Sequence, residues 1–280
     1  MSREYYLEKV KDLPYDEQVQ ELKNAYITFS LCKDDYSDKM LIICEILANE
    51  YKVFDYQVRL AEEYYKNGEF QKVITYTDCF VNNHCAEHGA NAIYSLDAMF
   101  FYKAQACEEL GHIEQAVQSY SQVCTNIKVK SGGKTLSEVD KTNLATCYFN
   151  IGTLLLDLDE DNRAFAAFSE AWQNKPTTSC AIYLGMLFAG GIGTSKDVES
   201  AESFLIMAVS TEDISDKESA LANYHLGKIY STEDGYIDKI KAREHLQKAQ
   251  AKGYSISDAE INQMLNSISK PKKKSFFGLW

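Results

Sequence analysis

The residues best suited to chemistry by type and spacing lie between positions 79 and 88. Cys79, His84, Cys85 and His88 are side chains that can ligate zinc. A zinc site of the usual kind combines two paired sets of ligands at set distances along the chain. Only one such set is present, so we expect a solvent-exposed loop over residues 84–92, a buried Cys79 before it, and no metal site.

A second segment, SGGKT at 131–135, is similar to the end of a phosphate-binding loop. That motif requires a glycine where this chain has Lys128, and it follows a β-strand, which the pattern here does not predict. We therefore interpret the segment as a flexible loop within 126–141.

No further segment indicates catalysis. The turn at 190–193 could hold an anion at the start of the next helix, but Asp197, the expected N-cap, would repel it. No cysteine has neighbours in sequence that would activate it as a nucleophile. We predict no catalytic residue, no cofactor and no enzyme activity.

The amino-acid composition narrows the possible classes of protein further. The formal net charge of −12 argues against nucleic acid as the main partner, because phosphate binding needs a basic surface. The opening MSREYYLEKVKDL lacks the apolar core of a secretory signal, and no uncharged apolar run approaches the ~18 residues of a membrane span. The eight cysteines fall mostly on predicted helix faces, which is typical of reduced thiols. We expect a cytoplasmic protein.

Helical periodicity with regular breaks organises most of the chain. Pairs of short amphipathic helices recur, and each pair leaves an apolar face that only a neighbouring pair can cover. Small or short apolar residues are separated by the same twelve positions in three units: Ala61 and Val73, Ala104 and Ala116, and Gly152 and Ala164.

These units resemble tetratricopeptide repeats. The third has every landmark of that motif, with Gly152, Ala164, Phe168, Ala171 and Pro176. The first unit departs from it, because Val73 replaces the second small residue and Thr77 the aromatic one. We expect a wider hairpin there.

Two later units resemble the Sel-like variant of the repeat. The first copy has Leu184-Gly185, the turn Gly191-Ile192-Gly193, Asp197 as a helix cap, and Ala201. The second copy has Leu226-Gly227, Asp238 and Ala242 but lacks the glycine-x-glycine turn.

The resemblance implies an all-α fold, a right-handed superhelical solenoid of antiparallel helix hairpins. We divide the chain into N-terminal helices forming a degenerate repeat (1–53), three tetratricopeptide-like repeats (54–176), two Sel-like repeats (177–254), a capping helix (255–269) and a basic-aromatic tail (270–280).

In tetratricopeptide arrays the first helix of each hairpin lines a concave groove that holds a polypeptide. Carried over to this chain, the resemblance predicts an inner face with many large rings: Arg59, Glu62, Tyr65, Phe101, Tyr102, Gln105, Phe149, Asn150, Thr153, Tyr183, Tyr224 and Lys228. The alternative is that another part of the chain fills this groove. Repeats that clamp a peptide carboxylate have Lys and Asn where this chain has Val58 and Glu62, so we expect an internal peptide or a protein surface as the ligand.

The tail joins lysines to large rings, with Lys272, Lys273, Lys274, Phe276, Phe277 and Trp280 as candidate docking residues. It could bind a partner, an anionic membrane or another copy, or serve as a solubilising end.

We conclude from the sequence that the protein is a non-catalytic scaffold or adaptor for a protein or peptide ligand. The alternative is a chaperone-like or regulatory protein that shields one client. An enzyme with an unrecognised site is the least expected reading.

Overall fold

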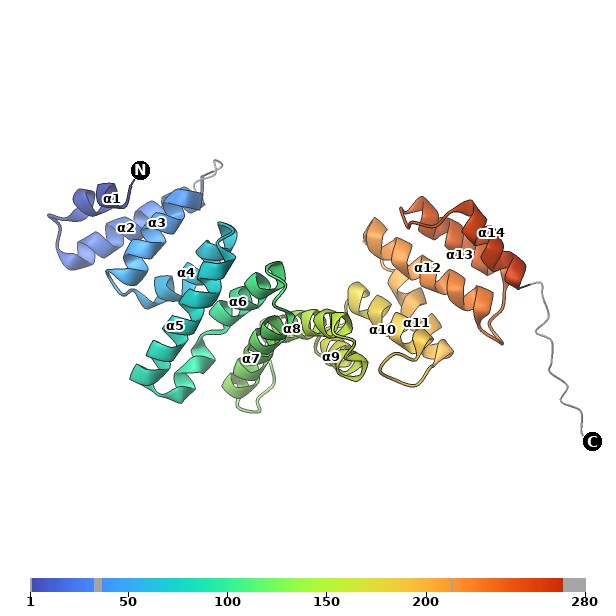
Figure 1. The fold of residues 1–280 in the computed structure, drawn as a ribbon. Coiled ribbons are helices and arrows are strands. Elements are labelled where there is room, and N and C mark those ends of the chain that lie inside the picture. Colours follow the sequence, from blue (N-terminus) through green and yellow to red (C-terminus); the bar gives the residue numbers. More distant parts are fainter. Residues whose placement is uncertain (1, 33–36, 213, 269–280) are drawn as a thin grey trace, which may run out of the picture. The chain divides into compact units, whose positions relative to one another are not determined.

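A computed structural model describes residues 2–32, 37–212 and 214–268. Within these ranges the regular elements are fourteen α-helices and one 3-10 helix, and none is a strand. The chain divides into two compact units, one up to Leu154 and one from Leu155 onward. The predicted all-α class of antiparallel helix hairpins is confirmed (Figure 1).

The first unit consists of helices that follow one another in chain order (Figure 1). They are α1 (Arg3–Val10), α2 (Tyr15–Ser30), α3 (Ser37–Asn49), α4 (Phe54–Lys66), α5 (Phe70–His88), η1 (Ala90–Ser95), α6 (Asp97–Glu109), α7 (Ile113–Ser131) and most of α8 (Glu138–Asp157).

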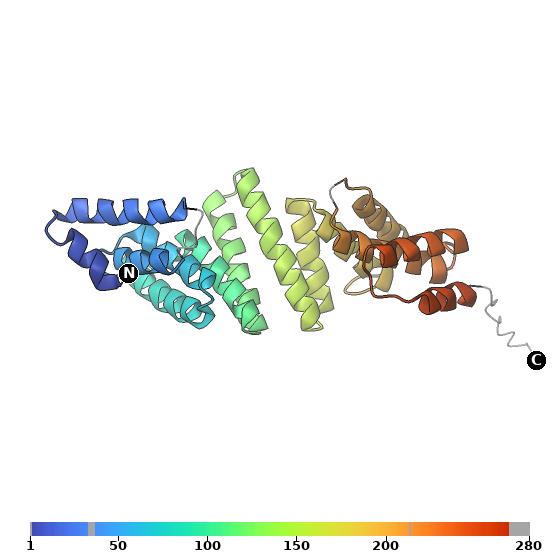
Figure 2. The same cartoon turned by 90° about the horizontal axis from the view of Figure 1, so that it is seen from above.

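The second unit continues the same pattern, and its helices also pair with their neighbours in sequence (Figure 2). They are α9 (Asp161–Asn174), α10 (Thr178–Gly190), α11 (Val198–Val209), α12 (Asp216–Thr232), α13 (Lys239–Ala251) and α14 (Asp258–Ser267).

The same tight turn closes three hairpins. Gly68, Gly111 and Asp159 have left-handed backbones, with φ of 72°, 72° and 56°. After each, an amide N–H donates to a carbonyl five residues back, for example His112 to Cys107 at 2.8 Å. Asp159 therefore occupies the position that glycine fills in the two earlier hairpins, although an L-side chain is strained there.

Small or short apolar residues occupy the centres of the hairpins, as the spacing predicts. Ala61, Val73, Ala104 and Ala116 are all fully buried. In the second unit a methyl group added to Gly185 would lie 2.7 Å from Leu205 Cγ, and one added to Gly227 would lie 2.6 Å from Leu246 Cγ. Both glycines thus let two helices pack more closely than any side chain would permit.

The glycine-x-glycine turn has a packing role. Gly193 has φ of 65°, and a Cβ built on it would lie 2.0 Å from the carbonyl oxygen of Asp161 at the start of α9. Asp197 then caps α11 by accepting the amide of Ser200 at 3.0 Å. The predicted cap is confirmed.

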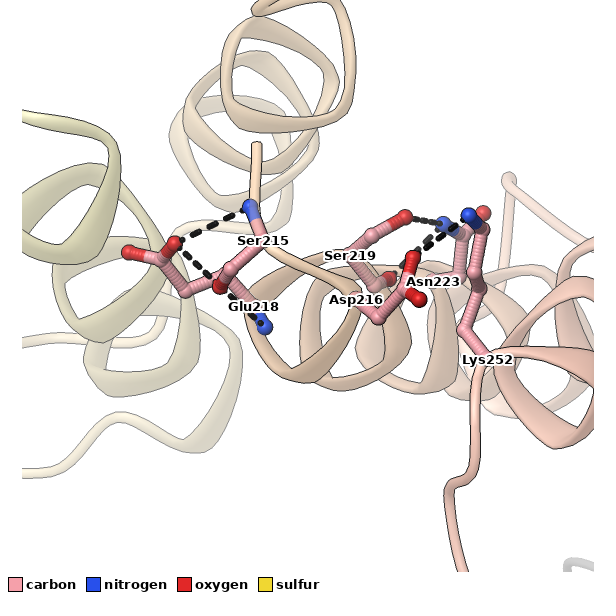
Figure 3. Close-up of polar contacts among 6 residues, drawn as sticks. All are labelled: Ser215, Asp216, Glu218, Ser219, Asn223 and Lys252. Carbon is pink, nitrogen blue, oxygen red and sulfur yellow. Dashed lines mark hydrogen bonds and ion pairs between the residues drawn. The ribbon is translucent and has the colours of Figure 1, made fainter. Parts of the chain in front are cut away.

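Helix α12 is fixed at its start by a reciprocal cap (Figure 3). The hydroxyl of Ser215 accepts the Glu218 amide, and the Glu218 carboxylate accepts the Ser215 amide. Asp216 pairs with Lys252 at 2.6 Å, which ties the start of α12 to the end of α13. This helix carries two of the predicted inner-face residues.

Two predicted loops are largely helical. Residues 84–88 belong to α5, which ends at Gly89 with φ of 87°, and α7 continues through Ser131. Cys79 is exposed, which contradicts the expected burial. The last turns of these two helices are exposed to solvent and need few apolar residues. The helical spacing of apolar residues is therefore lost there, and the sequence predicts a loop.

All eight cysteines are free thiols, and five of them are buried. Within the described ranges, no helix is both long enough and apolar enough to cross a membrane. The predicted tail residues Lys272, Lys273, Lys274, Phe276, Phe277 and Trp280 lie outside the described residues.

Candidate binding face

The first-unit part of the predicted inner face centres on α4 and α6, which pack against each other. Tyr65 on α4 and Tyr102 on α6 have ring centroids 5.8 Å apart. Phe70, at the start of α5, extends the ring contact, with its centroid 5.4 Å from that of Tyr65. All three rings are half-buried, so part of each remains accessible to a ligand.

Glu62 supplies the negative charge of this patch. Its carboxylate pairs with Lys66 at 2.7 Å. Burial, followed by the charge of Glu62, raises the pKa of Tyr102 to about 12, so its phenol stays protonated at neutral pH. A protonated phenol beside a carboxylate can donate one hydrogen bond and accept another.

Behind the patch lies a buried acid. Glu63 is 1% exposed, accepts a 2.6 Å hydrogen bond from the Tyr26 hydroxyl and lies 3.5 Å from Lys66. A buried carboxylate needs such partners because an isolated charge is costly in the interior. Glu63 therefore fixes Tyr26 and Lys66 in place.

Arg59 forms the positive edge of the patch. Its guanidinium lies 5.6 Å from the ring centroid of Tyr26 and 5.9 Å from that of Tyr56. These are cation–π distances, and the rings limit the conformations of an otherwise exposed side chain. Arg59 also interacts electrostatically with Glu62 and with Tyr102, so these residues and Tyr65 belong to one patch.

The remaining α6 candidates differ in their surroundings. Phe101 contacts Tyr102 at 6.0 Å between centroids and the fully buried Tyr120 at 5.7 Å. Part of the Phe101 ring is therefore committed to the core. Gln105 is half-buried on the same helix.

Three candidates lie on α8 and are also half-buried. Thr153 donates its hydroxyl proton to the carbonyl of Asn150 at 2.8 Å, which leaves less of it for a ligand. Burial raises the pKa of Tyr120, and an interaction with Asn150 opposes that rise, so Asn150 lies near the ring that Phe101 contacts. Phe149 is half-buried beside Asn150 in the chain.

In the second unit, Tyr224 and Lys228 lie together on α12. The Tyr224 ring stacks on Tyr254 at 4.1 Å, and the Lys228 ammonium lies 5.9 Å from the centroid of Tyr224. Tyr224 also lines a cleft of about 440 Å³ together with Met264 of α14. Tyr183 on α10 stacks instead on Phe168 at 4.9 Å, so its ring contributes to hairpin packing.

Four residues at these surfaces were missed from the sequence: Glu63, Lys66, Phe70 and Tyr254. Lys66 follows Glu62 by four positions, a spacing that predicts an ion pair on one helix face. Nothing in the sequence indicates that Glu63 is buried, because acidic residues on helices are usually exposed to solvent. Tyr254 follows the last helix of its repeat, where helical periodicity no longer predicts which way a side chain points.

Two buried cysteines lie on the helices that carry these surfaces, Cys107 on α6 and Cys180 on α10. Burial raises the pKa of the Cys107 thiol, and it raises the pKa of Cys180 to about 12, which makes both poor nucleophiles. Among the described residues, no three His, Cys, Asp or Glu side chains are grouped so as to hold a metal ion. Rings bordered by both charges suit a polypeptide ligand.

Comparison with known proteins gives matches at the level of structure. No family model matches the chain. No curated protein matches it in sequence. The chain is similar to BtubC (BKLC) from P. vanneervenii, at 17% identity and a TM-score of 0.48, over 96% of this chain and 98% of the other.

Two further solved structures are similar. A Sel1 repeat protein from Oxalobacter formigenes has 17% identity and a TM-score of 0.36 over 84% of this chain and 98% of its own. The TPR2AB-domain:pHSP90 complex of yeast Sti1 has 15% identity and a TM-score of 0.34, over 91% of this chain and 100% of the other. Similarity this distant concerns the helical-repeat fold alone. The similar structures include TPR and Sel1 repeat proteins, the class that the sequence motifs indicate.

Proposed function

We propose that the protein is a non-catalytic scaffold that binds a polypeptide through the predicted inner face. The observation that carries this proposal is the connected patch on α4 and α6, in which Tyr65 and Tyr102 lie 5.8 Å apart beside Glu62 and Arg59. The patch combines accessible rings with charges of both signs. Aromatic residues and arginine dominate the energetics of protein interfaces.

Preorganisation is the proposed mechanism. Tyr26 and Tyr56 hold Arg59, Lys66 holds Glu62, and Phe70 holds Tyr65, all before any ligand arrives. Each immobilised side chain spares roughly 0.5–1.5 kcal/mol of ordering cost on binding. A bound peptide would place an apolar side chain against the two tyrosines and polar groups near Glu62 and Arg59.

Two substitutions test this proposal. We expect Tyr102→Ala combined with Phe149→Ala to abolish selective partner binding while leaving the helical circular-dichroism signal unchanged. Loss of one anchoring ring in an interface costs about 2 kcal/mol or more, roughly thirtyfold in Kd. Affinity would be measured by biolayer interferometry on peptides selected by phage display against the wild-type protein.

Leu31→Ala and Val139→Ala provide matched controls, because these side chains are apolar and exposed at 80% and 68% but lie outside the predicted face. They should leave the affinity unchanged. Equal affinity for wild type and the Tyr102/Phe149 double variant would show that the ligand binds elsewhere.

A further inference from the structure

A cleft in the first unit lies apart from the predicted inner face. It has a volume of about 700 Å³ and is lined by residues from the end of α3, the turn that follows, α4 and α5. This volume falls within the range of sites that hold a peptide side chain or a small molecule. None of the predicted inner-face residues lines it.

A column of rings forms one wall of the cleft. Tyr76, Phe80, His84 and His88 recur every four residues along α5, so they share one helix face. Successive ring centroids are 6.0, 5.4 and 4.6 Å apart, and the first two pairs are stacked. Phe54 of α4 joins the column, with its centroid 5.2 Å from that of His84, and remains 39% exposed.

The charged groups of the cleft are few. Lys52, in the turn before α4, is exposed, and no carboxylate of the described residues pairs with it. Glu87 lies beside His88, with 3.8 Å between the carboxylate and Nε2. Two of the chain's five histidines therefore line the same cleft as a lysine and one acid, on a protein of net charge −12. The lysine and the acid of the lining balance each other, so the cleft becomes cationic only when its imidazoles are protonated.

The two imidazoles oppose each other's protonation. Burial lowers the pKa of His84, the proximity of His88 lowers it further, and Glu87 opposes the shift. Tyr76 stays neutral because burial raises the pKa of its phenol. A second carboxylate, supplied by a ligand, would favour the protonated imidazole, because an opposite charge nearby raises a histidine pKa.

We propose that this cleft binds an acidic peptide segment, with an aromatic side chain against Phe54 and Phe80 and a carboxylate at Lys52 and the imidazoles. The site is separate from the scaffold face and does not depend on it. Because the bound form prefers protonated histidine, binding strengthens as the pH falls from 8 to 6.

The probe is the acetylated, amidated tetrapeptide Glu-Phe-Glu-Leu, titrated while the imidazole resonances are followed by NMR. We expect His84 and His88 to shift with a common saturation curve, the pKa of His84 to rise, and Kd to fall about fivefold between pH 8 and pH 6. The matched peptides Gln-Phe-Gln-Leu and Glu-Ala-Glu-Ala should bind more weakly.

Lys52→Gln should weaken binding about threefold, as expected for an exposed ion pair, whereas Lys217→Gln on α12 should not change it. His84→Gln with His88→Gln should abolish the pH dependence. Tyr102→Ala should have no effect, which separates this site from the scaffold face. Absence of imidazole shifts, or equal binding of the neutral peptide, would overturn the proposal.

Discussion

Replacing Gly227 by alanine tests the close helix contact in the second unit. The new methyl group would meet Leu246 Cγ at 2.6 Å and Cδ2 at 2.7 Å. Carbon atoms pack at about 3.5–4.0 Å, so Leu246 or α13 must move by roughly 1 Å. Such overpacking costs about 1–3 kcal/mol, and alanine returns about 1 kcal/mol of helix propensity. We expect a net loss of roughly 0–2 kcal/mol in the free energy of unfolding.

A double-mutant cycle separates the two contributions. Leu246→Ala alone should cost about 2–5 kcal/mol, because Leu246 is fully buried. With Leu246 shortened, the methyl at position 227 no longer overlaps it and instead fills part of the cavity. The double variant should therefore be more stable than the sum of the single effects predicts, by about 1–3 kcal/mol.

The assay is urea denaturation followed by tryptophan fluorescence. Trp172 packs against the core of the second unit, and replacing Trp280, the other tryptophan, by phenylalanine isolates its signal. Comparing Gln247→Ala with Gln247→Gly measures the helix-propensity difference at an exposed position of α13. Additivity within about 0.5 kcal/mol would refute the proposed contact.

Three further predictions concern single positions. Asp159→Gly should raise the thermal midpoint by relieving its left-handed backbone, a gain of up to about 1 kcal/mol; a lowered midpoint would mean that the aspartate side chain stabilises the turn. Burial lowers the pKa of His225 to about 4 in the folded protein. The unfolded chain therefore binds more protons between pH 6.5 and 4, and the free energy of unfolding falls as the pH drops through that range. His225→Gln should flatten this part of the pH profile of urea midpoints. Hydrogen bonds from Ser179 and Ser215 lower the pKa of Glu218. The contribution of this carboxylate to the free energy of unfolding is therefore present above its ordinary pKa of 4.5 and is lost as the pH falls below that value. The stability difference between wild type and Glu218→Gln should disappear in acid, and a difference that stays constant with pH would contradict this assignment.

The sequence predicts the hairpins well because their centres admit only small residues. The twelve-residue spacing identifies Ala104 and Ala116, and both are fully buried. The Sel-like landmarks identify Gly185, Gly227 and the Asp197 cap, and each has the expected contact. Close contact between helices restricts these positions to a few residue types, so the positions can be identified from the sequence alone.

Surface chemistry was harder to predict. The sequence predicts a loop over residues 84–92 and so hides the ring column of α5, because a four-residue spacing brings side chains together only on a helix. Glu63 was missed because a buried carboxylate looks the same in sequence as a solvated one, and its partner Tyr26 lies 37 positions away. Contacts between distant helices depend on packing angles, which periodicity does not specify.

The pairing of helices that are adjacent in sequence affects how the protein is made. A hairpin such as α6 and α7 is complete once residues 97–131 have left the ribosome. At about 5–20 residues per second, its synthesis takes roughly 2–7 s, whereas helices form within microseconds. Each hairpin can thus fold on the nascent chain while the apolar face meant for its successor stays bare for seconds, and ribosome-associated chaperones could act during that interval.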